Sequence, residues 1–364
     1  MLFFILVLML AGFRWDVGID WMAYYNMFGG EILGNDILAE RMEPFNLISC
    51  AILTTNGFTD GRYWIWGMAL INLFFVTKSI SLYSKKVVIS MLLYILLGFY
   101  FDSLNMVRQA CAISIGLYGW QFIDKSLMKY MVTIGFATLF HSSAILLISL
   151  YFINKLSVSV KFLKTLVVVS ILLAPVSTIL APKLILLLPM YQQYGDSSVI
   201  KYASGSGNIL SYIRIVFPLF LMYLSICKWQ AIERSDYRYI ALNTICGLLV
   251  SIAFPTTQLM IRMSFYFTIG LIFYIPYLYD LFSIPIRKQL WTVTIVYYIL
   301  YLSVNYLFSP VAKIIPYTLR FDLDVYKLLS LSLILLSLVI VFMRLIRSRN
   351  KVLKSSIRSS VDEI

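Results

Sequence analysis

Long apolar runs constrain this chain more than any motif does. Of its 364 residues 61% are apolar and only 13% are charged, and the mean hydropathy is +0.86. A soluble domain usually carries about 25% charged residues, so this composition requires a bilayer as solvent. Runs that are long enough to span a membrane, or nearly so, are 1–13, 62–82, 87–101, 105–123, 128–153, 163–182, 209–227, 239–254, 258–282, 289–308 and 326–346. The sequence predicts an all-α polytopic integral membrane protein of about eleven or twelve hydrophobic helices, including re-entrant or half-helices.

Basic residues predict which connectors share one side of the membrane. Most of the 30 Lys and Arg lie in short connectors or in the tail, at 78–86, 125–129, 155–164, 228–238, 287–288 and 344–358. This distribution is typical of the positive-inside rule, so we expect these segments in the cytoplasm. The rule also accounts for the net charge of +13, which therefore does not indicate nucleic-acid binding.

The parity of the helices adds detail to this topology. As one helix, the run 128–153 would leave Lys155, Lys161 and Lys164 outside. We therefore favour a break at Phe140-His141-Ser142-Ser143 into two half-helices that return to the same side. The domain organisation that follows is one transmembrane domain over 1–346, external loops over 14–61 and 183–208, and a basic cytoplasmic tail over 347–364.

Three arginines inside apolar runs, Arg108, Arg214 and Arg262, are candidates for a functional site. Ionisable residues are costly within a membrane and usually serve a function there. The predicted topology puts all three near the outer ends of their helices, and guanidinium groups match the oxygens of phosphate or diphosphate. The alternative is that each arginine extends independently to the outer headgroups.

Helical spacing groups further polar residues with these arginines. Asn105, Arg108 and Gln109 are predicted to share one face, which makes Gln109 a further candidate for the anion site. A second face carries Arg262 and Tyr266. A third stripe, Asn243-Gly247-Ser251, has no charge and indicates a close helix-packing seam.

Candidates for proton transfer and sugar binding lie near the first apolar run and at His141, the only histidine. If residues 14–25 are helical, Asp16, Asp20 and Tyr24 share a face, where a carboxylate could accept a proton from a sugar hydroxyl and the aromatic residues could stack on sugar rings. The alternative is a solvated loop with interfacial aromatic residues. A histidine has a pKa near 6.5 and suits a general base, although a lone buried histidine can equally be a hydrogen-bonded core residue.

Some chemistry is disfavoured. The sequence has no P-loop and no clustered cysteines, and its Asp-x-Asp pattern, Asp322-Leu323-Asp324, lies in a late loop. We therefore expect no metal and no cofactor.

Several short motifs occur in an order that resembles the EpsG family of Wzy-like polysaccharide polymerases. They are Arg14…Val17-Gly18-Ile19-Asp20…Tyr24, Glu43-Pro44-Phe45, Asn105-Met106-Val107-Arg108-Gln109 and Phe140-His141-Ser142-Ser143, with a weaker late match at Arg262-Met263-Ser264-Phe265-Tyr266-Phe267. The resemblance implies a glycosyltransferase-type polymerase of the bacterial inner membrane, with its active site facing the periplasm or exterior. It would join oligosaccharide repeat units carried on undecaprenyl diphosphate into O-antigen, capsule or exopolysaccharide, and a chain-length regulator is a further partner that this class allows.

Within that expectation the residues take the following roles. The catalytic candidates are Asp20 and His141, followed by Asp16 and Glu43; the diphosphate-binding candidates are Arg108, Arg262, Arg14, Arg214 and Gln109; the sugar-binding candidates are Tyr24, Trp21, Tyr191, Tyr194 and Tyr202. Two rival classes stay open. A lipid-linked oligosaccharide flippase would distribute its charges through both leaflets, and a membrane O-acyltransferase would use His141 but needs an acyl-donor site.

Overall fold

The computed structural model describes residues 2–28, 42–186, 214–309 and 312–361. Within these ranges the chain forms helices and no strands, which confirms the predicted all-α class. The helices are α1 (Leu2–Gly12), α2 (Trp21–Phe28), α4 (Pro44–Thr55), α5 (Arg62–Tyr83), α6 (Val87–Leu96), α7 (Phe99–Asn105), α8 (Val107–Gly119), α9 (Leu127–Thr138), η3 (Ser142–Leu147), α10 (Ile148–Ile153), α11 (Val160–Leu173), α12 (Ser177–Leu186), α16 (Val216–Glu233), α17 (Arg238–Ala253), α18 (Gln258–Thr268), α19 (Leu271–Asp280), α20 (Ile284–Leu302) and α21 (Val325–Val361).

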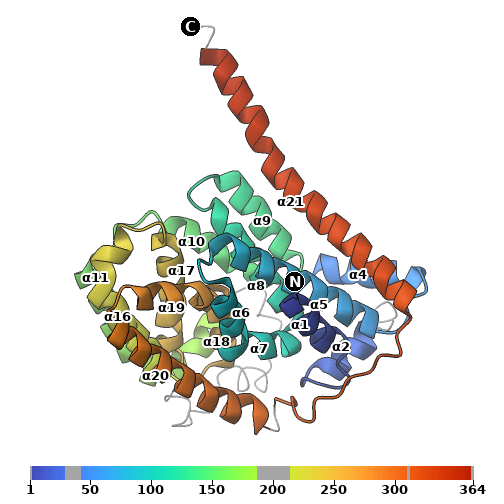
Figure 1. Ribbon diagram of the computed structural model, residues 1–364, viewed down its shortest axis with the longest axis horizontal. Helices are drawn as coiled ribbons and strands as arrows, with labels where there is room; N and C mark the ends of the chain where they lie inside the picture. Colours follow the sequence, from blue (N-terminus) through green and yellow to red (C-terminus); the bar gives the residue numbers. More distant parts are fainter. Residues whose placement is uncertain (1, 29–41, 187–213, 310–311, 362–364) are drawn as a thin grey trace.

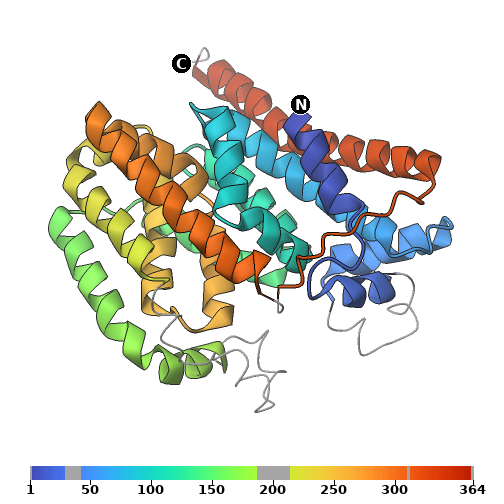
Figure 2. The same cartoon turned by 60° about the horizontal axis from the view of Figure 1, so that its bottom comes forward.

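The helices fall into two groups with a shared middle (Figures 1 and 2). One group contains α1, α2, α4, α5 and the lower part of α21, and the other contains α11, α16, α17, α19 and α20. Helices α6, α7, α8 and α18 lie between the groups, where α8 packs along α5 and α18 packs along α17. Helix α21 extends out of the body toward the C-terminus.

Fewer helices reach the length of a membrane span than the sequence has apolar runs. Among the described residues four helices are long and apolar enough, Arg62–Tyr83, Val160–Ala181, Ile284–Leu307 and Val325–Ile346. Two bent pairs raise this number to six: α6 with α7, at 52°, and α18 with α19, at 58°. The first bend occurs at Gly98, whose φ of 88° suits glycine because it has no Cβ.

The predicted break inside the run 128–153 is confirmed. Helix α9 ends at Thr138, His141 adopts an extended backbone, and η3 begins at Ser142. The hydroxyl of Tyr130 on α9 donates to the carbonyl of Leu147, at 2.5 Å, so the two halves lie side by side. This half-helix pair therefore enters the body and returns, and His141 lies at its turn.

Four of the predicted basic connectors, those around 83–86, 154–156, 237–238 and 280–288, lie together at one end of the molecule. Polar contacts between these connectors join Lys86 to Asp280, Tyr237 to the Tyr83 carbonyl, and Arg238 to the Asn154 carbonyl. Helix α5 ends here at Tyr83, and α20 begins here at Ile284. We call this end of the molecule the basic end.

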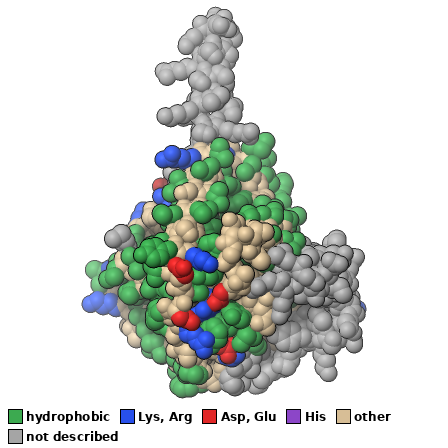
Figure 3. Space-filling model, turned by 90° about the vertical axis from the view of Figure 1, so that its right-hand side faces the viewer, with side chains coloured by type: hydrophobic (Ala, Val, Ile, Leu, Met, Phe, Trp, Pro, Cys, Tyr) green, Lys and Arg blue, Asp and Glu red, His purple; other side chains and the backbone are tan. Residues whose placement is uncertain are grey.

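The opposite end of α5 carries a band of mixed charge. Arg62 pairs with Asp60, at 2.6 Å, and with Asp322, and Lys327 donates to the Gly57 carbonyl at 2.9 Å. Figure 3 shows charged side chains of both signs close together on a face that is otherwise largely hydrophobic. Helices α5 and α21 both begin at this band.

The segment 313–320 contacts the turn that follows α1 and holds it in place. The amide of Trp15 donates to the Thr318 carbonyl, at 2.9 Å, and the amide of Gly18 donates to the Lys313 carbonyl, at 2.8 Å. The guanidinium of Arg320 lies over the Trp15 ring, 3.5 Å from its centroid. These contacts fix the path of the chain just before Asp20.

The predicted close seam on α17 is present. A Cβ added to Gly247 would lie 2.7 Å from the Thr268 backbone nitrogen, so only glycine permits this approach of α17 to α18. Ser251 donates to the Ser264 hydroxyl, at 3.2 Å. The seam holds α18, and with it Arg262, against the second group of helices.

Substituting Gly247→Ala should lower the thermal stability of the purified protein, because the new methyl group overlaps backbone atoms of α18. Overpacking of this kind costs about 1–3 kcal/mol. Gly135→Ala is the matched control, since nothing lies within 4 Å of a Cβ there. Thermal unfolding in detergent checks the prediction, and equal midpoints for the two variants would contradict it.

Candidate active site

Glu43 lies directly before α4, where Pro44 takes the first helical position, at which the missing N–H is not needed. The side-chain amide of Asn46 donates to Glu43 Oε2 and to the carbonyl oxygen of Phe140, both at 3.0 Å. Because of this bridge, the start of α4 is tied to the turn of the half-helix pair. The Glu43 side chain is only 11% exposed.

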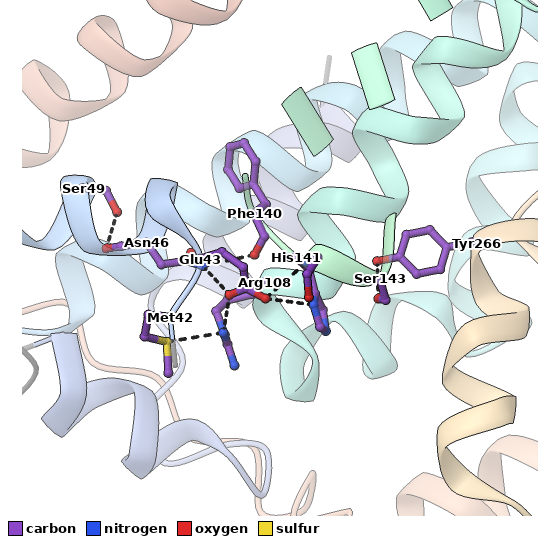
Figure 4. A network of polar contacts seen from close by, with 10 residues as sticks. Met42, Glu43, Asn46, Ser49, Arg108, Phe140, His141, Ser143 and Tyr266 are labelled. Atoms are coloured by element: carbon purple, nitrogen blue, oxygen red, sulfur yellow. Dashed lines mark hydrogen bonds and ion pairs between the residues drawn. The ribbon is translucent and has the colours of Figure 1, made fainter. Parts of the chain in front are cut away.

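Both oxygens of the Glu43 carboxylate have charged or polar partners (Figure 4). Nη1 of Arg108 is 2.5 Å from Oε2, and Nδ1 of His141 is 3.0 Å from Oε1. The imidazole meets Oε1 away from the direction of an ideal hydrogen bond. The amide of Ser142 also donates to Oε1, at 3.3 Å. One carboxylate therefore joins the starts of α4, α8 and η3, which we call the Glu43 network.

The electrostatics keep this carboxylate ionised. Burial disfavours the charged form of Glu43, but the contact with His141 and the charges of Arg108 and His141 outweigh burial and lower the pKa to about 2. Glu43 is therefore a fixed negative charge, and its contact with Nδ1 leaves Nε2 of His141 without a hydrogen-bond partner among the described residues.

Arg108 is the second residue of α8 and retains unused donor capacity. Besides Glu43, its Nη1 contacts the Met42 sulfur at 3.3 Å. Its Nε is buried and has no hydrogen-bond partner among the residues that the structure describes. A buried donor without a partner costs about 1–3 kcal/mol, so an acceptor oxygen brought here by a ligand would be favoured.

Helix α18, which carries Arg262, packs beside the network. Gln109, next to Arg108, donates to the Arg262 carbonyl at 3.0 Å, and the hydroxyls of Ser143 and Tyr266 are 2.9 Å apart. The Arg262 guanidinium forms neither an ion pair nor a hydrogen bond with any described residue. The N-termini of α8 and α18 add partial positive charge beside these arginines.

Asp20 is the acid that both arginines influence. Burial raises the pKa of Asp20, and the charges of Arg262 and Arg108 act against that rise. Its place is set by its neighbours, because the Ile19 amide donates to Asn105 Oδ1 at 2.7 Å and Gly18 has a φ of +98°. A Cβ at Gly18 would lie 2.8 Å from Asn105 Oδ1, so this turn needs glycine.

One predicted geometry is wrong. Asn105 and Arg108 do not share a helix face, because α7 ends at Asn105 and α8 begins at Val107 after the bend at Met106. The two side chains still serve one site from different sides, since Asn105 holds the turn before Asp20 while Arg108 holds Glu43.

Other candidates lie around the network rather than in it. Arg214 donates to Asn305 Oδ1, at 2.8 Å, in a neighbouring cavity of about 100 Å³ that Tyr297 and Tyr301 also line. Arg14 is 2% exposed, and Asp16 pairs with Lys313 at 2.6 Å. The arrangement of Arg14 and Asp16 favours support of the turn before Asp20.

The predicted aromatic residues are mostly internal. Trp21 is fully buried and stacks on Tyr25, with ring centroids 5.1 Å apart. Tyr24 is 8% exposed and stacks on Trp64 at 5.6 Å. Tyr191, Tyr194 and Tyr202 lie outside the described residues, so their role in sugar binding stays a prediction.

Sequence reasoning missed Asn46 and Asp102. Asp102 accepts a hydrogen bond from the Tyr306 hydroxyl, at 2.8 Å, and the charges of Arg262 and Arg214 both act on it. It is the only acid between residues 61 and 123, and an acid within an apolar region is a signal that could have identified it. Asn46 carried no such signal, because its importance comes from its contact with the distant Phe140 carbonyl.

Comparison with known proteins identifies a family. The family model described as the EpsG family matches residues 1–319. No curated protein and no solved structure matches the chain. The family match covers every residue of the Glu43 network and also Arg262 and Asp20.

Glu43→Gln should destabilise the protein above pH 4.5 and have progressively less effect as the pH falls toward 2. The Glu43 carboxyl has a pKa near 4.5 in the unfolded chain and of about 2 in the folded protein. The stabilisation that its ionised form gives is therefore complete above pH 4.5, and it is lost as the pH falls toward 2. The shift corresponds to at most about 3 kcal/mol. Unfolding of the wild type and the variant across this pH range measures the difference, and a pH-independent difference would count against the ion pair.

Proposed function

We propose that this chain, which belongs to the EpsG family of Wzy-like polysaccharide polymerases, joins oligosaccharide repeat units carried on undecaprenyl diphosphate at the outer face of the bacterial inner membrane. It is a multi-pass membrane protein, and its family implies a polymerase-type glycosyltransferase. The observation that carries the proposal is that Arg108 and His141 meet at the Glu43 carboxylate, while the charges of Arg108 and Arg262 both act on the nearby Asp20.

The two arginines hold the diphosphate of the donor. The Arg262 guanidinium has no hydrogen-bond or ion-pair partner among the described residues, and Arg108 has a buried Nε that lacks an acceptor among them. Gln109 holds the backbone of α18 beside α8, and the charges of both guanidinium groups act on the same carboxyl, that of Asp20. Guanidinium groups that are fixed before the reaction stabilise the charge that develops on the leaving diphosphate.

His141 acts as the general base. A hydroxyl oxygen of the acceptor sugar attacks the anomeric carbon of the donor, and its proton passes to Nε2 of His141. A new glycosidic bond forms while the bond from the anomeric carbon to the phosphate oxygen breaks, and its electron pair leaves with the lipid diphosphate. Glu43 orients the ring through Nδ1 and stabilises the positive charge that the ring acquires. Asp20 is the second candidate for this role, because both arginines act on it.

The distribution of charge supports the assignment to the outer face. The half-helix pair begins and ends near the basic end, and His141 lies at its far turn. Since basic connectors stay in the cytoplasm, the Glu43 network faces the other side. A flippase would need charges along a path through both leaflets, whereas the candidates here gather around one carboxylate.

Arg262→Gln and His141→Gln should each abolish long polysaccharide while the protein still inserts. Losing one preorganised contact with the developing charge costs about 10²–10³ in rate. Arg287→Gln is the matched control, because Arg287 pairs with Asp280 at the basic end. Gel analysis of polysaccharide length measures the effect, and wild-type length in the Arg262 variant would remove Arg262 from the site.

Gene disruption separates the polymerase from its rivals. Loss of a polymerase leaves a single repeat unit on the lipid A core or on the carrier. Loss of a flippase leaves no exported unit, and loss of an O-acyltransferase leaves full-length chains with altered sugars. Either of the latter two results would overturn the proposal.

A further inference from the structure

An apolar groove of about 550 Å³ lies between α4, α5 and α21, outside the Glu43 network. Its walls include Phe45, Ile48 and Ile52 from α4, Trp64 from α5, and Leu331 and Leu335 from α21. The volume lies within the range of small-molecule sites, about 300–1,000 Å³. On the open side, Ile48 and Ile52 are 58% and 57% exposed, so the groove is accessible along its length.

The polar side chains in this groove are already occupied. Ser49 accepts from Trp64 Nε1, at 3.1 Å, and donates to the Asn46 carbonyl, at 3.0 Å. Asn56 donates to the Ile52 carbonyl, at 2.7 Å. A ligand would therefore meet hydrocarbon and ring surfaces, and a polar or sugar group placed there would leave its own hydrogen bonds unmade.

The groove adjoins the charged site. Phe45, which lines the groove, is two residues from Glu43, and its ring stacks on Phe140 with centroids 3.8 Å apart. Phe140 directly precedes His141, and its carbonyl accepts from Asn46. If a ligand's anionic head binds the arginines, its apolar tail can enter the groove directly, because the groove begins at the start of α4 beside Glu43.

We infer that the groove between α4, α5 and α21 binds the portion of the substrate's prenyl chain nearest the diphosphate. This inference rests on the proposed function and names a subsite for the lipid carrier. The groove is too small for the whole of a long prenyl chain, so the remainder extends into the bilayer from the open side between α4 and α21.

Gly67 forms part of the floor of this groove. A Cβ there would lie 3.0 Å from Leu335 Cδ1, the end of a flexible side chain, so a larger residue can be accommodated but fills the space. Gly67→Leu is thus a suitable variant for blocking the groove. Gly135→Leu on α9 is the matched control, since nothing lies within 4 Å of its added Cβ.

The test uses the purified full chain with a farnesyl diphosphate that carries a diazirine on its chain, followed by mass-spectrometric mapping of the adducts. We expect adducts on α4, α5 and α21, reduced about tenfold in Gly67→Leu, which corresponds to about 1.4 kcal/mol of affinity, and unchanged in Gly135→Leu. Because Gly67→Leu could also perturb folding, Ile52→Asn serves as a second variant. It places a polar amide on the open side of the groove. It should reduce the adducts while the midpoint of thermal unfolding stays near that of the wild type.

Competitors distinguish this inference from the proposed function. Unlabelled farnesyl diphosphate should compete better than farnesol, and phosphatidylethanolamine should not compete. Adducts in the groove with equal competition by farnesol would support the groove and count against the diphosphate site. Adducts elsewhere, with diphosphate still preferred, would overturn the groove while leaving the proposed function intact. Equal competition by phosphatidylethanolamine would show a general lipid site and overturn the inference.

Discussion

The carboxylate of Glu43 is the constraint on which the arrangement of the site depends. It accepts from Arg108 and Ser142 and contacts His141, three groups that the chain delivers from two separate places. Without this buried negative charge, neither Arg108 nor His141 would have the carboxylate that both contact. Helices α4 and α8 and the turn of the half-helix pair are thus held together by charge where the surrounding packing is apolar.

The polarity of the whole molecule follows from where its helices begin and end. Basic connectors collect around Lys86, Asp280 and Arg238, while α8 and α18 begin at the opposite side of the body beside Arg108 and Arg262. The short and bent helices make this possible. A chain of straight spans would place its helix starts only at the two surfaces, whereas a half-helix pair carries His141 into the body.

The helical class, the grouping of basic connectors and the break at His141 could all be predicted from the sequence. Each depends on the residue types within one short stretch of the chain. The sequence was also sufficient for a close packing seam on α17, since small residues at a spacing of four are a local pattern, although it did not identify α18 as the partner helix. It could not rank Glu43 above Asp16, because the value of Glu43 lies in a partner 65 positions away along the chain. The bend at Met106 was missed for a different reason: nothing in an apolar run marks where a helix will turn, so Asn105 and Arg108 looked like neighbours on one face.

The partly buried pair of Arg108 and Glu43 also bears on how Arg108 avoids binding the headgroups of ordinary membrane lipids. Phosphodiester headgroups surround any membrane protein in great excess, and an unopposed arginine would attract them. A resident carboxylate already supplies the single negative charge that such a headgroup offers, so exchanging one for the other gains little. Under the proposed function, a group with two adjacent phosphates carries more negative charge than a phosphodiester. It would therefore gain more from Arg108 and Arg262 than the commonest competing lipid does, while Glu43 stays beside His141.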